Sequence, residues 1–123
     1  MIRCFVIASC LILLPMMSTV ALDLESVKHG EADSAGVKIH YVSLGEGPVV
    51  LFIHGFPESW YSWRHQMHGL SNDFKVVAMD TRGYNKSDKP EGIPAYDMSF
   101  LLADVTAVID ALGEDNVTIA AHD

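Results

Sequence analysis

Apolar residues change their spacing several times along the chain, and each spacing predicts a different element. Residues 37–42 alternate apolar and polar positions, which is typical of a half-buried strand. An unbroken apolar run follows at residues 49–53, and two mostly apolar runs follow at residues 74–79 and 116–121. Runs of this length and composition predict strands that are buried on both faces, as in the middle of a parallel sheet.

A first helix is expected after the second strand, beginning at about Ser59. Trp60, Trp63, Met67 and Leu70 recur there near helical spacing, and Ser59 can cap the start. The two tryptophans are therefore interpreted as packing residues first. His65 and His68 lie three positions apart on this helix, but no third ligand is near in sequence. A solvated face is favoured over a metal site.

The segment 98–112 predicts a second, longer helix. Asp97 or Ser99 can cap its start, and Gly113 can end it. Asp104 and Asp110 are expected to lie off its apolar stripe. That stripe consists of Leu101, Leu102, Val105, Val108, Ile109 and Leu112.

The order of elements is strand, strand, helix, strand, helix, strand, which predicts an α/β fold with a mostly parallel sheet flanked by helices. Residues 22–36 are polar and aperiodic, and we expect an irregular lead-in with at most a short strand. Chemistry in such sheets gathers at the carboxyl ends of the strands. His54, Asp80 and Asp123 each lie at or close to such an end.

The first 21 residues differ in composition from the rest. Arg3 is their only charged residue, a short apolar core follows it, and small residues precede a possible cut after Ala21. This is the pattern of a cleavable signal peptide, so we expect export to the periplasm or the medium, without stable membrane association after cleavage. An uncleaved anchor is the alternative, because the uncharged run extends to Leu22.

Composition narrows the function classes for the remainder. The 123-residue chain is 50% hydrophobic and 20% charged, which excludes a disordered tail, and its length allows one domain. Its formal net charge is −8, and no stretch is basic, so nucleic-acid binding is not expected. Residues 22–123 contain no cysteine and therefore predict neither a disulfide nor thiolate chemistry.

Three motifs at the predicted strand ends resemble the α/β-hydrolase superfamily, in its epoxide hydrolase and haloalkane/haloacetate dehalogenase branch. Residues 54–64 read HGFPESWYSWR and resemble the HGxP loop and first helix of epoxide hydrolases. Residues 80–90 read DTRGYNKSDKP, similar to the next loop of that family. Residues 121–123 read AHD and resemble the first half of the nucleophile elbow. The likeness covers roughly residues 37–123.

The resemblance implies roles for particular residues. Asp123 would be the nucleophile that forms an ester with the substrate. The backbone N–H of Phe56 would belong to the oxyanion hole, and Phe56 and Pro57 would line the substrate site. The remaining matched residues would shape the loops: His54, Gly55, Asp80, Arg82, Gly83 and His122. Asp80 is expected to accept hydrogen bonds from backbone N–H groups or from Arg82.

The family pattern also sets expectations beyond these residues. It implies no metal and no cofactor; the substrates would be water and a small molecule, either an epoxide or an organohalide. Phe56 favours epoxide hydrolases over haloalkane dehalogenases, but haloacetate dehalogenases also carry HGFP. The catalytic histidine, its acid partner and the lid tyrosines would lie after residue 123. The sequence is therefore interpreted as the amino-terminal part of an α/β-hydrolase fold domain, ending at the elbow. A non-catalytic product is the other class of hypothesis, and the isolated chain is expected to be inactive and poorly soluble.

Overall fold

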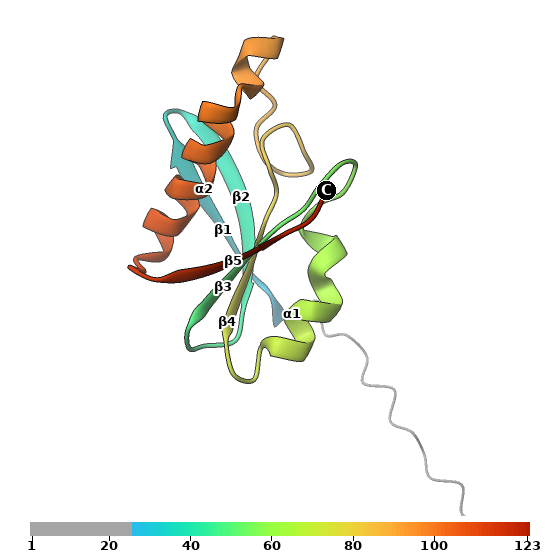
Figure 1. Ribbon diagram of the computed structural model, residues 1–123, viewed down its shortest axis with the longest axis vertical. Coiled ribbons are helices and arrows are strands. Elements are labelled where there is room, and N and C mark those ends of the chain that lie inside the picture. Colours follow the sequence, from blue (N-terminus) through green and yellow to red (C-terminus); the bar gives the residue numbers. More distant parts are fainter. Residues whose placement is uncertain (1–25) are drawn as a thin grey trace, which may run out of the picture.

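Five strands form one sheet in the order β1-β2-β4-β3-β5 (Figure 1). The computed structural model describes residues 26–123, so the predicted export segment lies outside the described residues. The strands are β1 (Lys28–Ser34), β2 (Val37–Leu44), β3 (Val49–Ile53), β4 (Lys75–Met79) and β5 (Val117–Ala121). β1 pairs antiparallel with β2, and β2 with β4, whereas β3 pairs in parallel with both β4 and β5. The three apolar runs thus form the parallel part of the sheet, as predicted.

Strand β1 corrects the expectation of an irregular lead-in over residues 22–36. Seven residues of that segment pair with β2, and Ala32 and Ser34 are buried. A two-residue turn joins the strands, with φ of +52° at Ala35 and +87° at Gly36. Asp33 Oδ1 accepts the Gly36 N–H at 2.8 Å. The polar sequence concealed this strand, because an edge strand gains its stability from backbone pairing and needs few apolar side chains.

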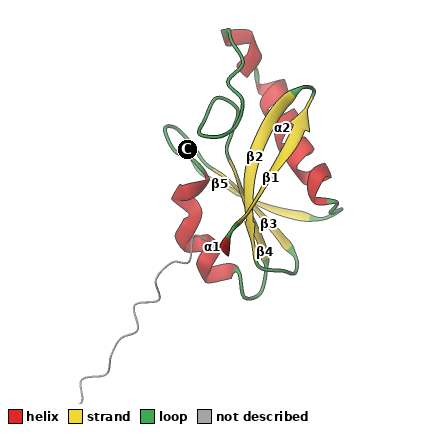
Figure 2. Ribbon diagram, turned by 180° about the vertical axis from the view of Figure 1, so that it is seen from behind, coloured by secondary structure: helices red, strands yellow, loops and turns green. Residues whose placement is uncertain are grey.

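Two crossovers place helices on opposite faces of the sheet (Figures 1 and 2). A 3₁₀ turn (Trp60–Trp63) and helix α1 (Arg64–Leu70) connect β3 to β4. A second 3₁₀ turn (Ile93–Tyr96) and helix α2 (Met98–Leu112) connect β4 to β5, which lies on the far side of β3. The chain thus reverses its direction across the sheet around β3. Such a switch point is where ligands bind in open α/β sheets.

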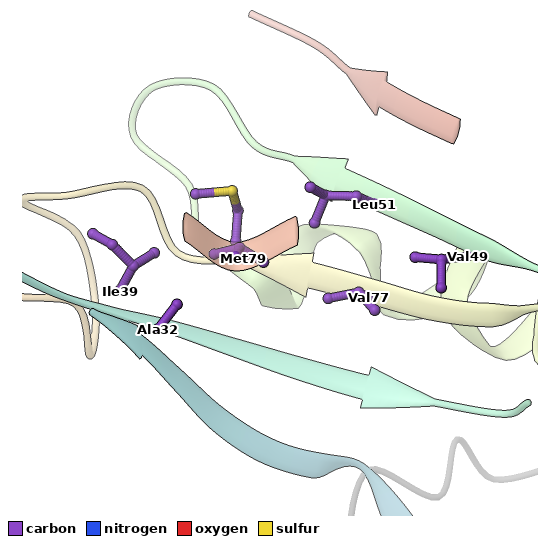
Figure 3. Packing of buried hydrophobic residues seen from close by; sticks show 7 residues of the cluster. Ala32, Ile39, Val49, Leu51, Val77 and Met79 are labelled. Carbon is purple, nitrogen blue, oxygen red and sulfur yellow. The ribbon is translucent and has the colours of Figure 1, made fainter. Parts of the chain in front are cut away.

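The alternating side chains of β3 and β4 divide the core into two clusters. Val49, Leu51, Val77 and Met79 point toward α2 and meet its Val108 (Figure 3). The intervening residues of both strands point toward α1, where Met67, Trp60 and Trp63 cover them. Side chains of successive strand residues face opposite ways, so continuous apolar runs are needed when both faces are covered.

Helix α2 has the predicted bounds, but two details of the prediction are wrong. Gly113 ends the helix with φ +69°, as expected, whereas neither Asp97 nor any other side chain caps its start. Asp104, expected off the apolar stripe, is buried, and Leu102 on that stripe is 60% exposed. The Ser59 side chain likewise makes no cap for the first 3₁₀ turn. The face of α2 toward the sheet therefore carries a buried carboxylate, that of Asp104.

Strand β5 also differs from its prediction as a buried strand. It lies at the edge of the sheet, and Ile119 is 50% exposed. Among residues 26–123, its backbone pairs with β3 and with no other strand. Across residues 26–123, none of the helices combines the length and apolarity needed to cross a membrane.

Candidate active site

The loop after β3 and the end of β5 touch at the carboxyl edge of the sheet. β3 and β5 pair in parallel up to Ile53 and Ala121, and the His122 N–H lies 3.4 Å from the Ile53 oxygen. A Cβ placed on Gly55 would stand 2.7 Å from Asp123 Cα. Figure 1 shows the C-terminal end of the chain beside this loop. Only glycine allows the two main chains to approach so closely, so the predicted HGFP loop and Asp123 share one site.

Hydrogen bonds fix His54 at the start of the HGFP loop. Its Nδ1 donates to the Gly55 oxygen at 2.9 Å, and its Nε2 accepts the Thr81 N–H at 3.1 Å. A ring nitrogen facing a carbonyl must carry the proton, and one facing an N–H must not, so this pair of contacts defines a neutral imidazole. The histidine ties the loop after β3 to the loop after β4.

Phe56 projects from the same loop into solvent. The peptide bond between Phe56 and Pro57 is cis, and the Phe56 side chain is 78% exposed. A turn closes behind it, where the Glu58 N–H donates to the Gly55 oxygen at 3.0 Å. Within residues 26–123 the Phe56 N–H makes no hydrogen bond. This unpaired backbone donor, one residue after Gly55, is available to an oxygen of a bound molecule.

Asp80, at the end of β4, is fully buried and accepts three hydrogen bonds. Its donors are the Trp60 N–H at 2.8 Å, the His40 Nδ1–H at 2.7 Å and the Asn85 amide at 2.9 Å. The expectation of a backbone donor is confirmed, but Arg82 is not a partner. Asn85 has φ +42°, a conformation that Asn tolerates, and its side chain adds the third bond.

Arg82 instead pairs with Asp104 of α2. Its Nε and Nη2 donate to the two carboxylate oxygens, both at 2.6 Å, and its Nη1 donates to the Ala95 oxygen at 2.6 Å. The side-chain hydrogen bond to Asp104 raises the pKa of Arg82 above its ordinary value, against the opposing effect of burial. The next residue, Gly83, has φ +89° and packs so tightly against Tyr96 that a Cβ would clash. The Arg82–Asp104 ion pair holds the loop after β4 against helix α2.

His122, beside Asp123, also has a defined partner. Its Nε2 lies 3.0 Å from a carboxylate oxygen of Glu58, and its ring packs against Trp63 with the ring centroids 4.9 Å apart. Glu58 belongs to the HGFP loop, so this contact is a second link between that loop and the end of β5. The family resemblance implied a supporting place for His122, but its partner Glu58 was missed because no local spacing connects the two residues.

A cavity of about 420 Å³ opens beside the loop, between it and the start of α2. Gly55 and Phe56 line it from one side, and Met98 and Leu102 from the other, with Tyr84 between them. The lining is mostly apolar, which suits a small organic molecule. Among the described residues, no group of three histidine, cysteine or carboxylate side chains is arranged to hold a metal ion.

This arrangement can perform nucleophilic chemistry on a small apolar molecule. Gly55 touches the main chain of Asp123, precedes the residue with the unpaired N–H and lines the apolar cavity, although Asp123 itself does not line that cavity. A carboxylate can attack an electrophilic carbon to give an ester, and a fixed N–H can stabilise an oxyanion when that ester reacts further.

Comparisons with known proteins agree with this geometry. A family model described as the alpha/beta hydrolase fold matches residues 48–123, more than half of the chain. The chain is 40% identical over 101 residues to "Epoxide hydrolase 2" of Siraitia grosvenorii, covering 81% of this chain and 32% of that protein. It is 46% identical over 89 residues to "Epoxide hydrolase 1" of Caenorhabditis elegans, covering 71% of this chain and 22% of that protein.

Solved structures give the same result. The crystal structure of an epoxide hydrolase from Vigna radiata superposes with a TM-score of 0.78 at 48% identity, covering 81% of this chain and 32% of that one. An epoxide hydrolase from an endophytic Streptomyces gives a TM-score of 0.77 at 48% identity, covering 80% and 30%. The chain spans about a third of the length of these relatives or less. From its strand order, its matched motifs and the family model, the chain belongs to the α/β-hydrolase fold family.

Proposed function

We propose that this chain provides the nucleophile and half of the oxyanion hole of an enzyme that opens epoxides to diols. A carboxylate oxygen of Asp123 attacks one ring carbon, the ring C–O bond breaks, and the departing oxygen takes up a proton. The product is an ester between Asp123 and the substrate. The contact between Gly55 and the Asp123 main chain carries the proposal, because it brings the two motifs into one site.

Water would complete the reaction by attacking the ester carbonyl. Negative charge then develops on the carbonyl oxygen, where the unpaired N–H of Phe56 is available as a donor. A donor held by the backbone needs no reorganisation at that moment, which is why such donors are effective. The groups that activate the water and protonate the epoxide oxygen are not assigned to residues 26–123.

Two observations favour an epoxide as the substrate. The relatives described above are named epoxide hydrolases, and the cavity beside Phe56 is mostly apolar. The HGFP sequence also fits haloacetate dehalogenases, so it does not exclude a haloacetate as the substrate. The same Asp nucleophile could expel a halide from such a compound. Haloacetate turnover is therefore the second outcome that the experiment must separate.

Isotope labelling of Asp123 tests the proposal. The product of the complete open reading frame is purified and mixed in excess with styrene oxide in water enriched in ¹⁸O. Because water attacks the ester carbonyl, we expect the heavy oxygen in the peptide that contains Asp123 and none in the diol of the first turnover. Asp123→Ala should abolish turnover, whereas Asp115→Asn, which alters an exposed carboxylate elsewhere, should not.

The other outcomes are equally informative. Heavy oxygen in the first diol, with an unlabelled Asp123, would mean direct attack by water and would refute the ester mechanism. Turnover of chloroacetate without turnover of styrene oxide would assign the dehalogenase reaction. A folded product that turns over neither compound would support the non-catalytic alternative.

We also propose that residues 1–21 direct export. The support is their composition alone: one early basic residue, an apolar core and small residues before Ala21. Fusion of residues 1–30 to a reporter enzyme that is active only after export should give activity, with the cut after Ala21 found by terminal sequencing. An uncut, membrane-bound fusion would assign an anchor instead.

A further inference from the structure

A row of three hydrogen-bonded side chains runs from the surface of the β1–β2 hairpin to the buried Asp80. His29 Nδ1 lies 2.8 Å from His40 Nε2, and His40 Nδ1 lies 2.7 Å from Asp80 Oδ2. His40 and Asp80 are buried, whereas His29 is exposed. The two histidines are a diagonal pair on neighbouring antiparallel strands, because Glu31 lies opposite His40 in the register. Nothing in the proposed reaction uses this row.

The direction of each hydrogen bond follows from the acceptor at the inner end. Asp80 already accepts the N–H groups of Trp60 and Asn85, so it acts as an acceptor and the His40 Nδ1–H donates to it. When His40 is neutral, its Nε2 must then accept, and His29 Nδ1–H is the donor. Either histidine can gain one proton without loss of the bond, but two protons would leave two N–H groups facing each other.

Asp80 and its neighbour Thr81 hold the two ends of the loop that carries Phe56. Its Oδ1 accepts the N–H of Trp60, where the loop enters the 3₁₀ turn, at 2.8 Å. The adjacent Thr81 donates its N–H to His54, at the start of the loop, at 3.1 Å. A rotation of the Asp80 carboxylate would therefore displace Trp60 and, with it, the end of the segment 54–60. His40 and Asn85 are the side chains that set that rotation.

We propose that His29 and His40 are positioning residues for the oxyanion-hole loop, acting as a histidine–histidine–carboxylate relay that orients Asp80. This inference rests on the proposed function, since it concerns the loop that carries Phe56. The hydrogen bond from His29 keeps the His40 Nδ1–H directed at Asp80. The row thereby fixes the Asp80 carboxylate, which anchors the loop at Trp60, without touching the substrate. Ester hydrolysis, which uses the oxyanion hole, should depend on the row, and ester formation should depend on it much less.

The charges around the pair are consistent with this arrangement. Glu31 and Lys86 border the same small cavity as the two histidines, and Asp80 is hydrogen-bonded to His40. Burial, then Lys86 and then His40 lower the pKa of His29 below its ordinary value of 6.5, against the opposing effect of Asp80. A neutral His29 is thereby favoured near pH 7, in the state that keeps both hydrogen bonds.

Nuclear magnetic resonance tests the row without any need for activity. The product of the complete open reading frame is prepared with ¹⁵N-labelled histidine, and the two rings are assigned from His29→Asn and His40→Gln. We expect a coupling between His29 Nδ1 and His40 Nε2 across the hydrogen bond, and a protonated Nδ1 in His40. Absence of the coupling, or a proton on Nε2 alone in His40, would overturn the relay.

Kinetics test the positioning role with a matched pair of variants. His29→Leu removes the donor, whereas His29→Asn retains an amide nitrogen near the place of Nδ1. We expect His29→Leu to slow ester hydrolysis about tenfold, the effect of one lost hydrogen bond, and to change ester formation less than about twofold. The covalent ester should then accumulate in rapid-quench mass spectrometry. His29→Asn should restore most of the rate, and His65→Leu, on the exposed face of α1, should have no effect.

The outcomes separate this inference from the proposed function. Equal slowing of both steps in His29→Leu, or no rescue in His29→Asn, would reduce the row to a structural contact and overturn the inference. Failure to label Asp123 in the unmodified protein would instead overturn the proposed function, and the coupling experiment would still decide whether the relay exists.

Discussion

The buried ion pair between Arg82 and Asp104 makes a quantitative prediction about stability. The side chains are 3% and 1% exposed, and Arg82 also donates to the Ala95 oxygen. Asp104→Ala would leave the guanidinium buried with the Ala95 oxygen as its one remaining hydrogen-bond acceptor and the Phe100 ring beside it. Because a buried charge that loses its counter-ion retains its desolvation cost, we expect a loss of about 3–5 kcal/mol.

Replacing both partners should cost far less. Arg82→Met combined with Asp104→Leu removes both buried charges and fills most of the same volume, a change that is often neutral. The Ala95 oxygen then loses its donor, which is expected to cost about 1–3 kcal/mol. The double variant should therefore be more stable than Asp104→Ala, although it differs from the natural sequence at two positions.

Urea unfolding measures these differences in the product of the complete open reading frame. The midpoint should fall in Asp104→Ala with an unchanged slope, and part of the loss should return in the double variant. Asp110→Ala, on the exposed side of the same helix, should stay within about 0.5 kcal/mol. An Asp104→Ala protein within about 1 kcal/mol of the natural one would refute the argument, because it would mean that water or another group compensates Arg82.

Three further predictions address the site, the hairpin and pH. Gly55→Ala would place a Cβ 2.7 Å from Asp123 Cα, and the forced displacement should lower kcat about a hundredfold; unchanged turnover would show that the two loops need not touch. Ala35→Asn should raise the free energy of unfolding by about 1 kcal/mol, because φ +52° strains alanine and asparagine tolerates it; a lower free energy of unfolding would contradict this. Since the pKa of His29 is lowered in the folded state, the unfolded chain binds its proton first, so stability should fall as pH drops below about 6.5; His29→Asn should remove that part of the pH dependence, and an identical pH profile in the variant would contradict the assignment.

The parallel strands and the second helix could be predicted because their signal is local. Val49–Ile53 and Lys75–Met79 are buried on both faces, so nearly every residue is apolar and the pattern is unambiguous. Strand β1 was missed because its stability comes from backbone pairing with β2, and its own polar sequence does not indicate that pairing. β5 was predicted to be buried from its apolar residues, and within residues 26–123 it has a partner strand, β3, on one side.

The candidate site was predictable as separate pieces and not as a set of contacts. Motif resemblance pointed to Phe56 and Asp123 as candidates, and the strand ends indicated that the two loops would meet, as the approach of Gly55 to the Asp123 main chain confirms. The partners of Asp80 and Arg82 could not be found in this way, because His40 precedes Asp80 by 40 residues and Asp104 follows Arg82 by 22. Asp104 also interrupts an apolar helix face, where hydrophobic periodicity gives no reason to bury a charge.

The meeting of Gly55 with Asp123 also bears on how such a site can diversify. Main chain faces main chain there, so substitution at this position offers no gradual adjustment of the distance between the proposed nucleophile and the proposed oxyanion donor. The opposite wall of the cavity consists of side chains on the first turns of α2, among them Met98 and Leu102, which are 67% and 60% exposed. Selection for new substrates, in nature or in the laboratory, should therefore accumulate its changes on that helix and leave the glycine untouched.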